Sequence, residues 1–299
     1  MTEVLEADTC ADDMHWAGLS FRVMDDEELA RQQAEVEDRV HFHRGVWWRH
    51  ARGLFWLPSA QFTEIDHDTS WPHPLKALVG YMHIAKPGSA YNGFFRAIVR
   101  ERMPSYSIAM LAHDTRKKVR KGLIQLQVRP VVHLDQFISD GFDVYRSWQE
   151  RVHWGRDKSS LPVFEGWMSR VFRSPHQLVL GAYLKNKLVA FTLPYAVRNV
   201  ATTSFIASHS DFLPYNPNDV MFHAFMCIAR QTRGVEMVEF GPVSRKPTLD
   251  SFKLKYGNVK EFRSYTWMNP LIRVVAGRRI RERFPWLNAD SSGEQPPTE

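Results

Sequence analysis

The spacing of hydrophobic and polar residues separates strands from helices clearly from Ser105 onward. Residues 123–129, LIQLQVR, alternate apolar and polar side chains with the period of two that half-buried strands show. Gly122 is predicted to end the preceding helix in a left-handed conformation. Asn216 is predicted to cap a helix that has Pro217 at its first position. The expected elements are helix 107–121, strand 123–129, helices 134–150 and 161–173, strands 177–184, 187–197 and 199–209, helix 218–232, strand 235–240, helix 249–256 and strand 259–268.

The flanking regions differ in composition, and this difference predicts four parts. Short aromatic and β-branched runs between Pro and Gly residues predict small strands before the regular region. The predicted parts are an acidic N-terminal arm (1–40), a small β-rich domain (41–104), the main domain (105–268), and a basic amphipathic segment with a disordered tail (269–299).

Composition narrows the class of protein. The chain has 299 residues, a formal net charge of +6 and two cysteines, Cys10 and Cys227. Two distant cysteines do not make a disulfide framework, and the first thirteen residues carry five acids and no Lys or Arg. Without an apolar run long enough to span a bilayer, a cytoplasmic protein is expected.

Two motifs carry a resemblance to a known family. The segment LDSFKLKYG (249–257) and the basic helix SYSIAMLAHDTRKKVRKG (105–122) resemble segments of Fem-type aminoacyltransferases, a branch of the GNAT acyltransferase superfamily. The predicted order β-α-α-β-β-β-α-β-α-β is also the order of that fold. The resemblance implies an α/β (α+β) protein with a mixed, V-splayed sheet flanked by helices. Residues 41–104 would then be a truncated GNAT-like repeat.

The resemblance also implies where an acyl donor binds. In this fold the donor lies where two central strands splay apart, and it runs along strand 199–209 toward the helix that Asn216 opens. The expected donor-binding residues are Ser208, Tyr215, Asn216, Asn218 and Asp219. Acetyl-CoA enzymes of this fold hold the pyrophosphate with a glycine-rich turn, but DFLPYNPND (211–219) contains no glycine. This departure argues against acetyl-CoA and agrees better with Fem-like relatives, which lack the turn. The resemblance therefore implies an acyl-CoA or an aminoacyl-tRNA as the donor. The alternative to donor binding is that Asn216 and Asn218 only cap the helix.

Acyl transfer to nitrogen needs a group that accepts the amine proton. Glu239 and His209 are the candidates, because Glu239 lies on the strand before Gly241 and His209 ends strand 199–209. Glu239 could also be a solvated edge residue, and His209 could be polarised by Asp211. No nucleophilic Ser or Cys motif accompanies them, so direct transfer is expected. His41 and His43 share a strand face, but without further ligands no metal is predicted.

Several cations are candidates for binding the acceptor or an anion. They are Arg245, Lys246 and Lys253 near the motif, and Arg116 and Arg120 on the basic helix. Leu249, Phe252 and Tyr256 are expected on the buried face of helix 249–256. The alternative for the basic helix is that its cations simply face solvent. Segment 273–287 could contact an anionic membrane surface or pack on its own domain.

The sequence thus favours a N-acyltransferase that moves an acyl or aminoacyl group onto an amine acceptor. The expected partners are the acyl donor, the amine, tRNA and a peripheral membrane surface, but not DNA. The alternative is a GNAT-fold binding or scaffold protein without catalysis.

Overall fold

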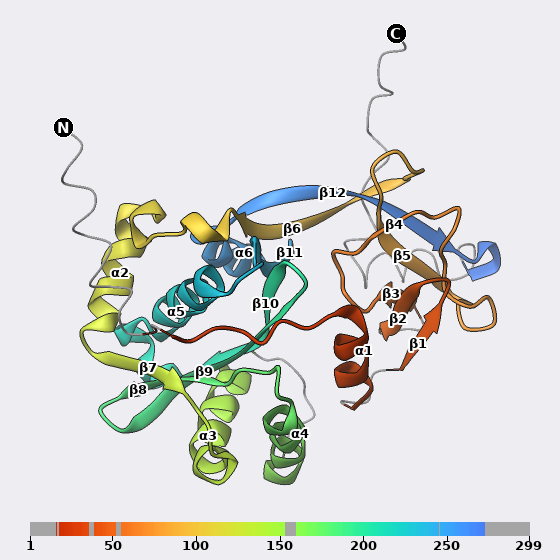
Figure 1. Ribbon diagram of the computed structural model, residues 1–299. Helices are drawn as coiled ribbons and strands as arrows, with labels where there is room; N and C mark the ends of the chain where they lie inside the picture. Colours follow the sequence, from red (N-terminus) through yellow and green to blue (C-terminus); the bar gives the residue numbers. More distant parts are fainter. Residues whose placement is uncertain are drawn as a thin grey trace, which may run out of the picture. The chain divides into compact units, whose positions relative to one another are not determined.

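The computed structural model describes residues 16, 18–35, 39–51, 55–152, 160–244 and 246–272, and the chain divides into two compact units (Figure 1). Unit 1 combines residues 1–24 with 100–240, and unit 2 combines residues 25–99 with 241–299. Each unit therefore draws on segments far apart in the sequence.

Unit 1 contains a mixed sheet with the order β11-β10-β9-β8-β7. β11 is parallel to β10, and the other neighbours are antiparallel. The strands are β7 (Leu126–Pro130), β8 (Leu180–Leu184), β9 (Lys187–Val197), β10 (Val200–Ser208) and β11 (Met237–Pro242).

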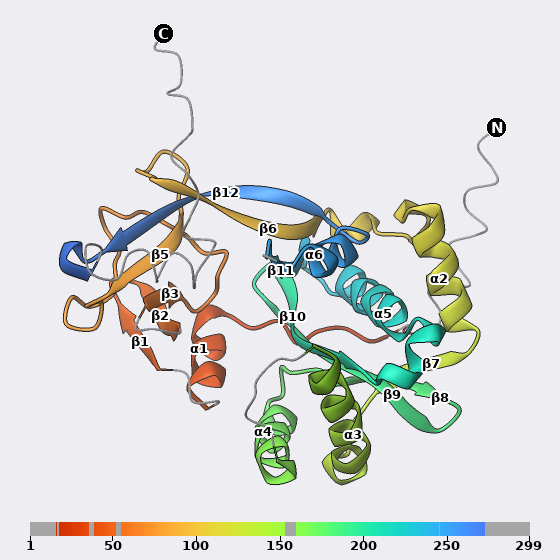
Figure 2. The same cartoon turned by 180° about the vertical axis from the view of Figure 1, so that it is seen from behind.

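Helices cover both faces of this sheet. α2 and α5 lie on one side and α3 and α4 on the other, in both views (Figures 1 and 2). α5 is buried over most of its length, because nearly all residues from Pro217 to Ala229 are apolar or enclosed. The helices are α2 (His113–Leu123), α3 (Leu134–Val152), α4 (Leu161–Arg173) and α5 (Pro217–Gln231), with short 3-10 helices η2 (Met103–Ser105), η3 (Ile108–Met110) and η4 (Ser210–Tyr215).

The two central strands of unit 1 splay apart. β10 and β11 pair only at three positions, the last being Thr202 with Glu239, whereas β10 continues to Ser208. On its other side, β10 has a bulge against β9, since the register jumps from Thr203 to Ile206. The predicted V-splayed, mixed sheet is confirmed.

Unit 2 contains strands in the order β1-β2-β3-β5-β12-β6, and β4 also pairs with β5. β3 and β4 are parallel to β5, and the other pairs are antiparallel. Its elements are α1 (Asp26–Glu35), β1 (Val40–His43), β2 (Val46–Ala51), β3 (Phe55–Pro58), β4 (Glu64–Ile65), β5 (Gly80–Ala85), β6 (Gly93–Glu101), α6 (Pro247–Lys253) and β12 (Asn258–Met268).

The division into units differs from the domain boundaries predicted at residues 40, 104 and 268. β12 pairs with β6 from Asn258 to Ser264 and with β5 from Ser264 to Met268, so α6 and β12 belong with the N-terminal strands. The predicted N-terminal arm (1–40) is divided between the units, because residues 1–24 belong to unit 1 and α1 belongs to unit 2. Most of the predicted tail, from residue 273, lies outside the described residues.

Two local predictions about helix ends were wrong. Gly122 lies inside α2 and is not among the residues with positive φ. A Cβ on Gly122 would lie 2.3 Å from Cγ2 of Val220 on α5, so the glycine permits close helix packing. Asn216 is itself left-handed, with φ 56°, and its side chain makes no capping hydrogen bond.

In the part of the chain that the structure describes, no helix combines the length and the apolarity needed to cross a membrane.

Candidate functional site

Glu239 lies at the point where the central strands separate. It is the last residue of β11 that pairs with β10, and only 7% of its surface is exposed. Its Oε2 accepts a hydrogen bond of 2.6 Å from the hydroxyl of Thr202, its partner across the strands. The reading of Glu239 as a solvated edge residue is therefore excluded, and its carboxylate is fixed at the apex of the splay.

His209 lies just beyond the other end of β10, and acids of two elements approach its ring. Nε2 is 3.5 Å from Oδ2 of Asp143 on α3, and Nδ1 is 3.8 Å from Oδ2 of Asp211. Nδ1 accepts a hydrogen bond from the backbone N–H of Asp211, which leaves Nε2 to carry the proton in the neutral tautomer. The carboxylate facing this proton is Asp143, which the sequence did not suggest.

The two predicted catalytic residues do not lie together. Glu239 is paired with Thr202, and His209 follows seven residues later along β10. At about 3.3 Å per residue, the separation along the strand is about 23 Å. The structure therefore assigns the two groups to opposite ends of the splayed region, and they cannot serve the same proton transfer.

Arg151 of α3 fixes the end of β10, and sequence analysis missed it. Its guanidinium donates hydrogen bonds to the carbonyl oxygen of Ser208 (3.0 Å), to Oγ of Ser208 (3.2 Å) and to Oγ of Ser210 (3.1 Å). Ser147, one turn earlier on α3, accepts from the N–H of Ser210 at 2.9 Å. Burial lowers the pKa of Arg151 from its usual value. The spacing Asp143, Ser147, Arg151 places all three on one helix face, a signal that the sequence did contain.

The bulge of β10 is held by side-chain hydroxyls. Thr192 of β9 and Thr203 both donate to the carbonyl oxygen of Phe205, at 2.8 and 2.9 Å, and their own hydroxyls lie 2.7 Å apart. Oγ of Ser204 donates to the carbonyl oxygen of Leu193 at 3.1 Å. Bulges commonly redirect backbone groups beside active sites. Here the bulge lies immediately beyond the last β10–β11 pair.

The predicted donor-binding residues follow β10 in sequence. Ser208 is fully buried and bound to Arg151, so its hydroxyl supports the strand end. Tyr215 ends η4, and Asn216 turns the chain into α5. Asn218 and Asp219 lie in the first turn of α5, where Asp219 is only 7% exposed. The first turn of α5 therefore carries a carboxylate where the fold could otherwise hold a phosphate.

The predicted cations near the motif belong to unit 2. Lys253 is the last residue of α6, not near its start as predicted, and its Nζ is 3.5 Å from the carbonyl oxygen of Pro242. Lys246 precedes α6, and Arg245 lies outside the described residues. Leu249, predicted to be buried, is 43% exposed, and Tyr256 is fully buried beyond the helix end.

The other predicted cations lie on α2. Arg116 is half-buried and donates to the carbonyl oxygen of Ala109 at 3.1 Å, whereas Arg120 is exposed. Val119, between these cations, is fully buried, so this face of α2 packs against the protein. The cations of the helix are Arg116, Lys117, Lys118, Arg120 and Lys121. Among the described residues no group of three or more His, Cys, Asp or Glu is placed to hold a metal.

Residues 113–253 match the acetyltransferase (GNAT) domain family, a region that runs from the first residue of α2 to the last of α6. Among curated proteins, none matches the sequence.

Solved structures share the fold across both units. A domain (DUF2156) assigned to a lysylphosphatidylglycerol synthetase from Agrobacterium fabrum is 14% identical, with a TM-score of 0.59 over 89% of this chain and 94% of its own. FemX is 11% identical, with a TM-score of 0.57 over 88% and 97%. L-PGS from Bacillus licheniformis is 10% identical, with a TM-score of 0.50 over 86% and 96%.

Residues 113–253 thus match the GNAT acetyltransferase domain family, and the fold of the chain is one that FemX and the lysylphosphatidylglycerol synthetase domain share. The predicted resemblance to the Fem-like branch is confirmed at the level of the fold. The match to this family supports acyl transfer in general.

Proposed function

We propose that this protein transfers an acyl or aminoacyl group directly onto the nitrogen of an amine acceptor, with Glu239 as the general base. The observation that carries the proposal is the buried carboxylate of Glu239 at the apex of the β10–β11 splay, with Thr202 fixing one of its oxygens. A carboxylate whose position is held by a hydrogen bond, next to strands that open, is suited to accept an ammonium proton.

The donor would lie along β10 between Thr203 and Ser208. In the described part of the chain β11 leaves β10 after Thr202, so the backbone groups of β10 on that side have no strand partner. An extended amide chain or an aminoacyl group can bind such an edge by backbone hydrogen bonds. The bulge at Thr203–Ile206 redirects backbone groups toward the carbonyl that is attacked.

The far end of the donor site favours a donor that places no pyrophosphate on α5. The buried Asp219 carboxylate and the left-handed Asn216 replace the glycine-rich turn there. The negative charge of a carboxylate at the start of a helix would repel a phosphate bound there. Among the two expected donors, an aminoacyl-tRNA or an acyl-CoA whose phosphates lie elsewhere fits better than one bound as in acetyl-CoA enzymes.

The surroundings of two nucleophiles, Cys227 and Ser208, support direct transfer. Cys227 is 1% exposed inside α5, and the hydroxyl of Ser208 accepts from Arg151 with no exposed surface. An acyl-enzyme on either residue would require opening of the core. The neutral amine would therefore attack the carbonyl carbon of the bound donor, and its nitrogen would lose a proton to Glu239. The C–S or C–O bond of the donor would then break, and Glu239 would return this proton to the departing sulfur of CoA or oxygen of tRNA.

Donor binding and product formation test the proposal together. Native mass spectrometry with acetyl-CoA, a long-chain acyl-CoA and charged tRNA identifies the donor. The donor that binds is then incubated with a panel of amines, and acylated products are sought by mass spectrometry in wild type and Glu239→Gln. A donor-dependent product that Glu239→Gln fails to form supports the proposal. A bound donor that reacts with no amine supports the non-catalytic alternative.

A further inference from the structure

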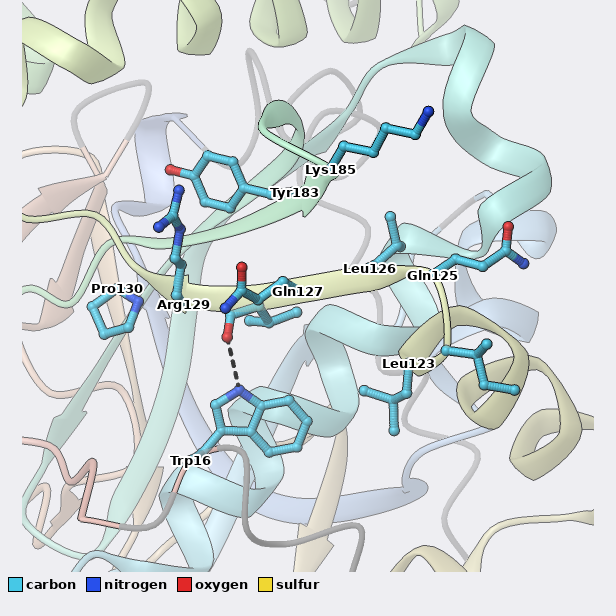
Figure 3. Close-up of a pocket in the computed structure, with 11 residues that line it drawn as sticks. Trp16, Leu123, Gln125, Leu126, Gln127, Arg129, Pro130, Tyr183 and Lys185 are labelled. Carbon is cyan, nitrogen blue, oxygen red and sulfur yellow. Dashed lines mark hydrogen bonds between the residues drawn. The ribbon is translucent and has the colours of Figure 1, made fainter.

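Unit 1 contains a pocket at the edge of its sheet farthest from β11. It has a volume of about 510 Å³ and surrounds β7, with walls from the end of α2 and from β8 (Figure 3). β10, β9 and β8 separate it from β11, and at about 4.8 Å per strand this is about 19 Å. The pocket is thus distinct from the splay at Glu239, and its volume is in the range of ligand pockets.

The side chains of this pocket combine positive charge with a planar stack. The guanidinium of Arg129 lies 4.3 Å from the centre of the Tyr183 ring, and Lys185 follows in the turn after β8. Figure 3 shows Arg129, Tyr183 and Lys185 projecting to the same side of β7. No acid lines the pocket, and within the described residues neither cation makes a salt bridge.

The edge of β7 is closed to a further strand. The indole N–H of Trp16 donates to the carbonyl oxygen of Val128 at 3.3 Å, and Pro130 has no N–H to offer (Figure 3). Pro and covering side chains are common ways to block an edge strand. A ligand is therefore recognised by the exposed side chains of Gln125, Gln127 and Arg129 rather than by strand addition.

Further cations continue from the pocket along α2. Lys117, Lys118 and Lys121 are exposed, and Leu123, the last residue of the same helix, lines the pocket. Lys117 is six residues from Leu123, which is about 9 Å along the helix axis. Burial raises the pKa of Tyr183, so at neutral pH its ring adds no negative charge.

We propose that this pocket is a nucleotide-binding site, in which a base stacks on Tyr183 and Arg129 and phosphates contact Lys185 and the α2 lysines. Aromatic and guanidinium planes bind bases of any sequence, and Gln125 and Gln127 offer amides to base edges. A planar base with attached phosphates can contact the planes of Tyr183 and Arg129, the glutamine amides and the lysines at the same time. The proposal does not depend on acyl transfer at Glu239.

Two sources share this chemistry, a free nucleotide and an unpaired nucleotide of RNA. Fluorescence anisotropy with a labelled short single-stranded RNA, and competition by AMP, distinguish them. Binding that AMP displaces at low concentration indicates the free nucleotide, and binding that AMP leaves intact indicates RNA. Absence of binding of both overturns the proposal, as does binding to phosphatidylglycerol vesicles alone.

Variants locate the site. Tyr183→Leu and Arg129→Gln should each weaken binding about tenfold, because loss of one stacking partner has effects of this size. Changing Lys117, Lys118 and Lys121 to Gln should reduce the slope of log affinity against log salt by about 2 for RNA. Arg233→Gln removes an exposed charge outside the pocket and should leave binding unchanged.

Arg129→Gln is the decisive variant, since Arg129 is exposed and its loss should not unfold the protein. RNA or AMP affinity that equals wild type in both Arg129→Gln and Tyr183→Leu, with unchanged thermal midpoints, overturns the proposal. Photo-crosslinking of a thiouridine-labelled RNA to the peptide 123–130 would support it independently.

Discussion

Thr202 donates its hydroxyl hydrogen to Oε2 of Glu239 across the last pair of residues that joins β10 to β11. The bond joins the two strands at the position where they begin to diverge. It occupies one oxygen of a buried carboxylate and orients the other. Replacing the Glu239 carboxylate and replacing the Thr202 hydroxyl should therefore lower kcat/KM by different factors.

Glu239→Gln should reduce kcat/KM by about 10²–10⁴, the range for loss of a general base. Glutamine keeps the shape and still accepts from Thr202, so the thermal midpoint should change little. Thr202→Val retains the base but removes this hydrogen bond, and kcat/KM should fall by only about tenfold, the equivalent of one hydrogen bond to a charged group. Steady-state kinetics with the identified donor measures both variants.

Equal losses in the two variants would contradict this assignment, because they would indicate that Thr202 itself reacts. In that case the Thr202 hydroxyl would be acylated, and initial-rate plots would show parallel lines. Direct transfer instead requires intersecting lines and no donor consumption in the absence of amine.

Gly122→Ala should destabilise unit 1. The new Cβ would meet Cγ2 of Val220 at 2.3 Å and the carbonyl oxygen of Tyr215 at 3.0 Å, so α2 and α5 must move apart. Overpacking of this kind costs about 1–3 kcal/mol. Gly166→Ala in α4 is the matched control, since its Cβ would meet only Arg170 at 3.9 Å and should stabilise by about 0.5–1 kcal/mol.

Chemical denaturation of both variants measures these differences. Val220→Ala combined with Gly122→Ala should recover part of the loss, because the contact with Cγ2 disappears. If Gly122→Ala stabilises the protein as Gly166→Ala does, α2 and α5 are not in close contact at this position.

Periodicity alone predicted most elements of unit 1. Residues 161–173 form α4 with the predicted bounds, and the three antiparallel strands after it occur as expected. These elements depend on local patterns of apolar residues and on turns. β12 was also predicted as a strand, but its partners β5 and β6 are more than 150 residues away, and alternation within a strand does not identify its neighbours.

The site was predicted only in part, for the same reason. Glu239 was identified because it precedes a break in a strand, but its contact with Thr202 comes from pairing with a strand 37 residues earlier. A glycine near a helix end looks the same in the sequence whether it ends the helix or allows a second helix to pack closely. Gly122 is of the second kind. Arg151 contacts residues 57 and 59 positions away, and a charged residue on an amphipathic helix gives no sign of such a partner.

Arg151→Met should destabilise unit 1 by about 1.5–3 kcal/mol, because Ser208 and Ser210 lose a charged donor at the end of β10. Arg151→Lys should recover less than half of this, since a single ammonium cannot reproduce the forked contacts. Arg173→Met is a suitable control, because Arg173 is exposed at the end of α4. Urea unfolding of the three variants makes the comparison, and equal stability of Arg151→Met and wild type would contradict it.

The stability of unit 2 should depend on the ionisation of buried histidines. Burial lowers the pKa of His41 to about 4, with the charge of Lys76 contributing, and burial also lowers the pKa of His83. Nε2 of His41 accepts a hydrogen bond of 3.2 Å from the N–H of His73, so the neutral ring carries its proton on Nδ1. Protonation of Nε2 would remove this acceptor.

The sign of the effect follows from the direction of the shift. The unfolded chain binds a proton at each histidine near pH 6.5, whereas the folded chain binds one at His41 only near pH 4. The contribution of neutral His41 to the free energy of unfolding is therefore complete above pH 6.5, and it decreases as the pH falls to about 4. Free energies of unfolding of wild type should fall through this range.

His41→Gln isolates the contribution of one histidine. The glutamine oxygen can take the position of Nε2 and accept from His73 without titrating, so the free energy of unfolding should fall less steeply between pH 6.5 and 4 than in wild type. His113→Gln is the control, because 79% of the His113 side chain is exposed. Acidic residues titrate in the same range in all three proteins, so the difference between profiles reports His41. Parallel profiles for wild type and His41→Gln would show that His41 is charged in the folded protein, in conflict with its burial beside Trp56.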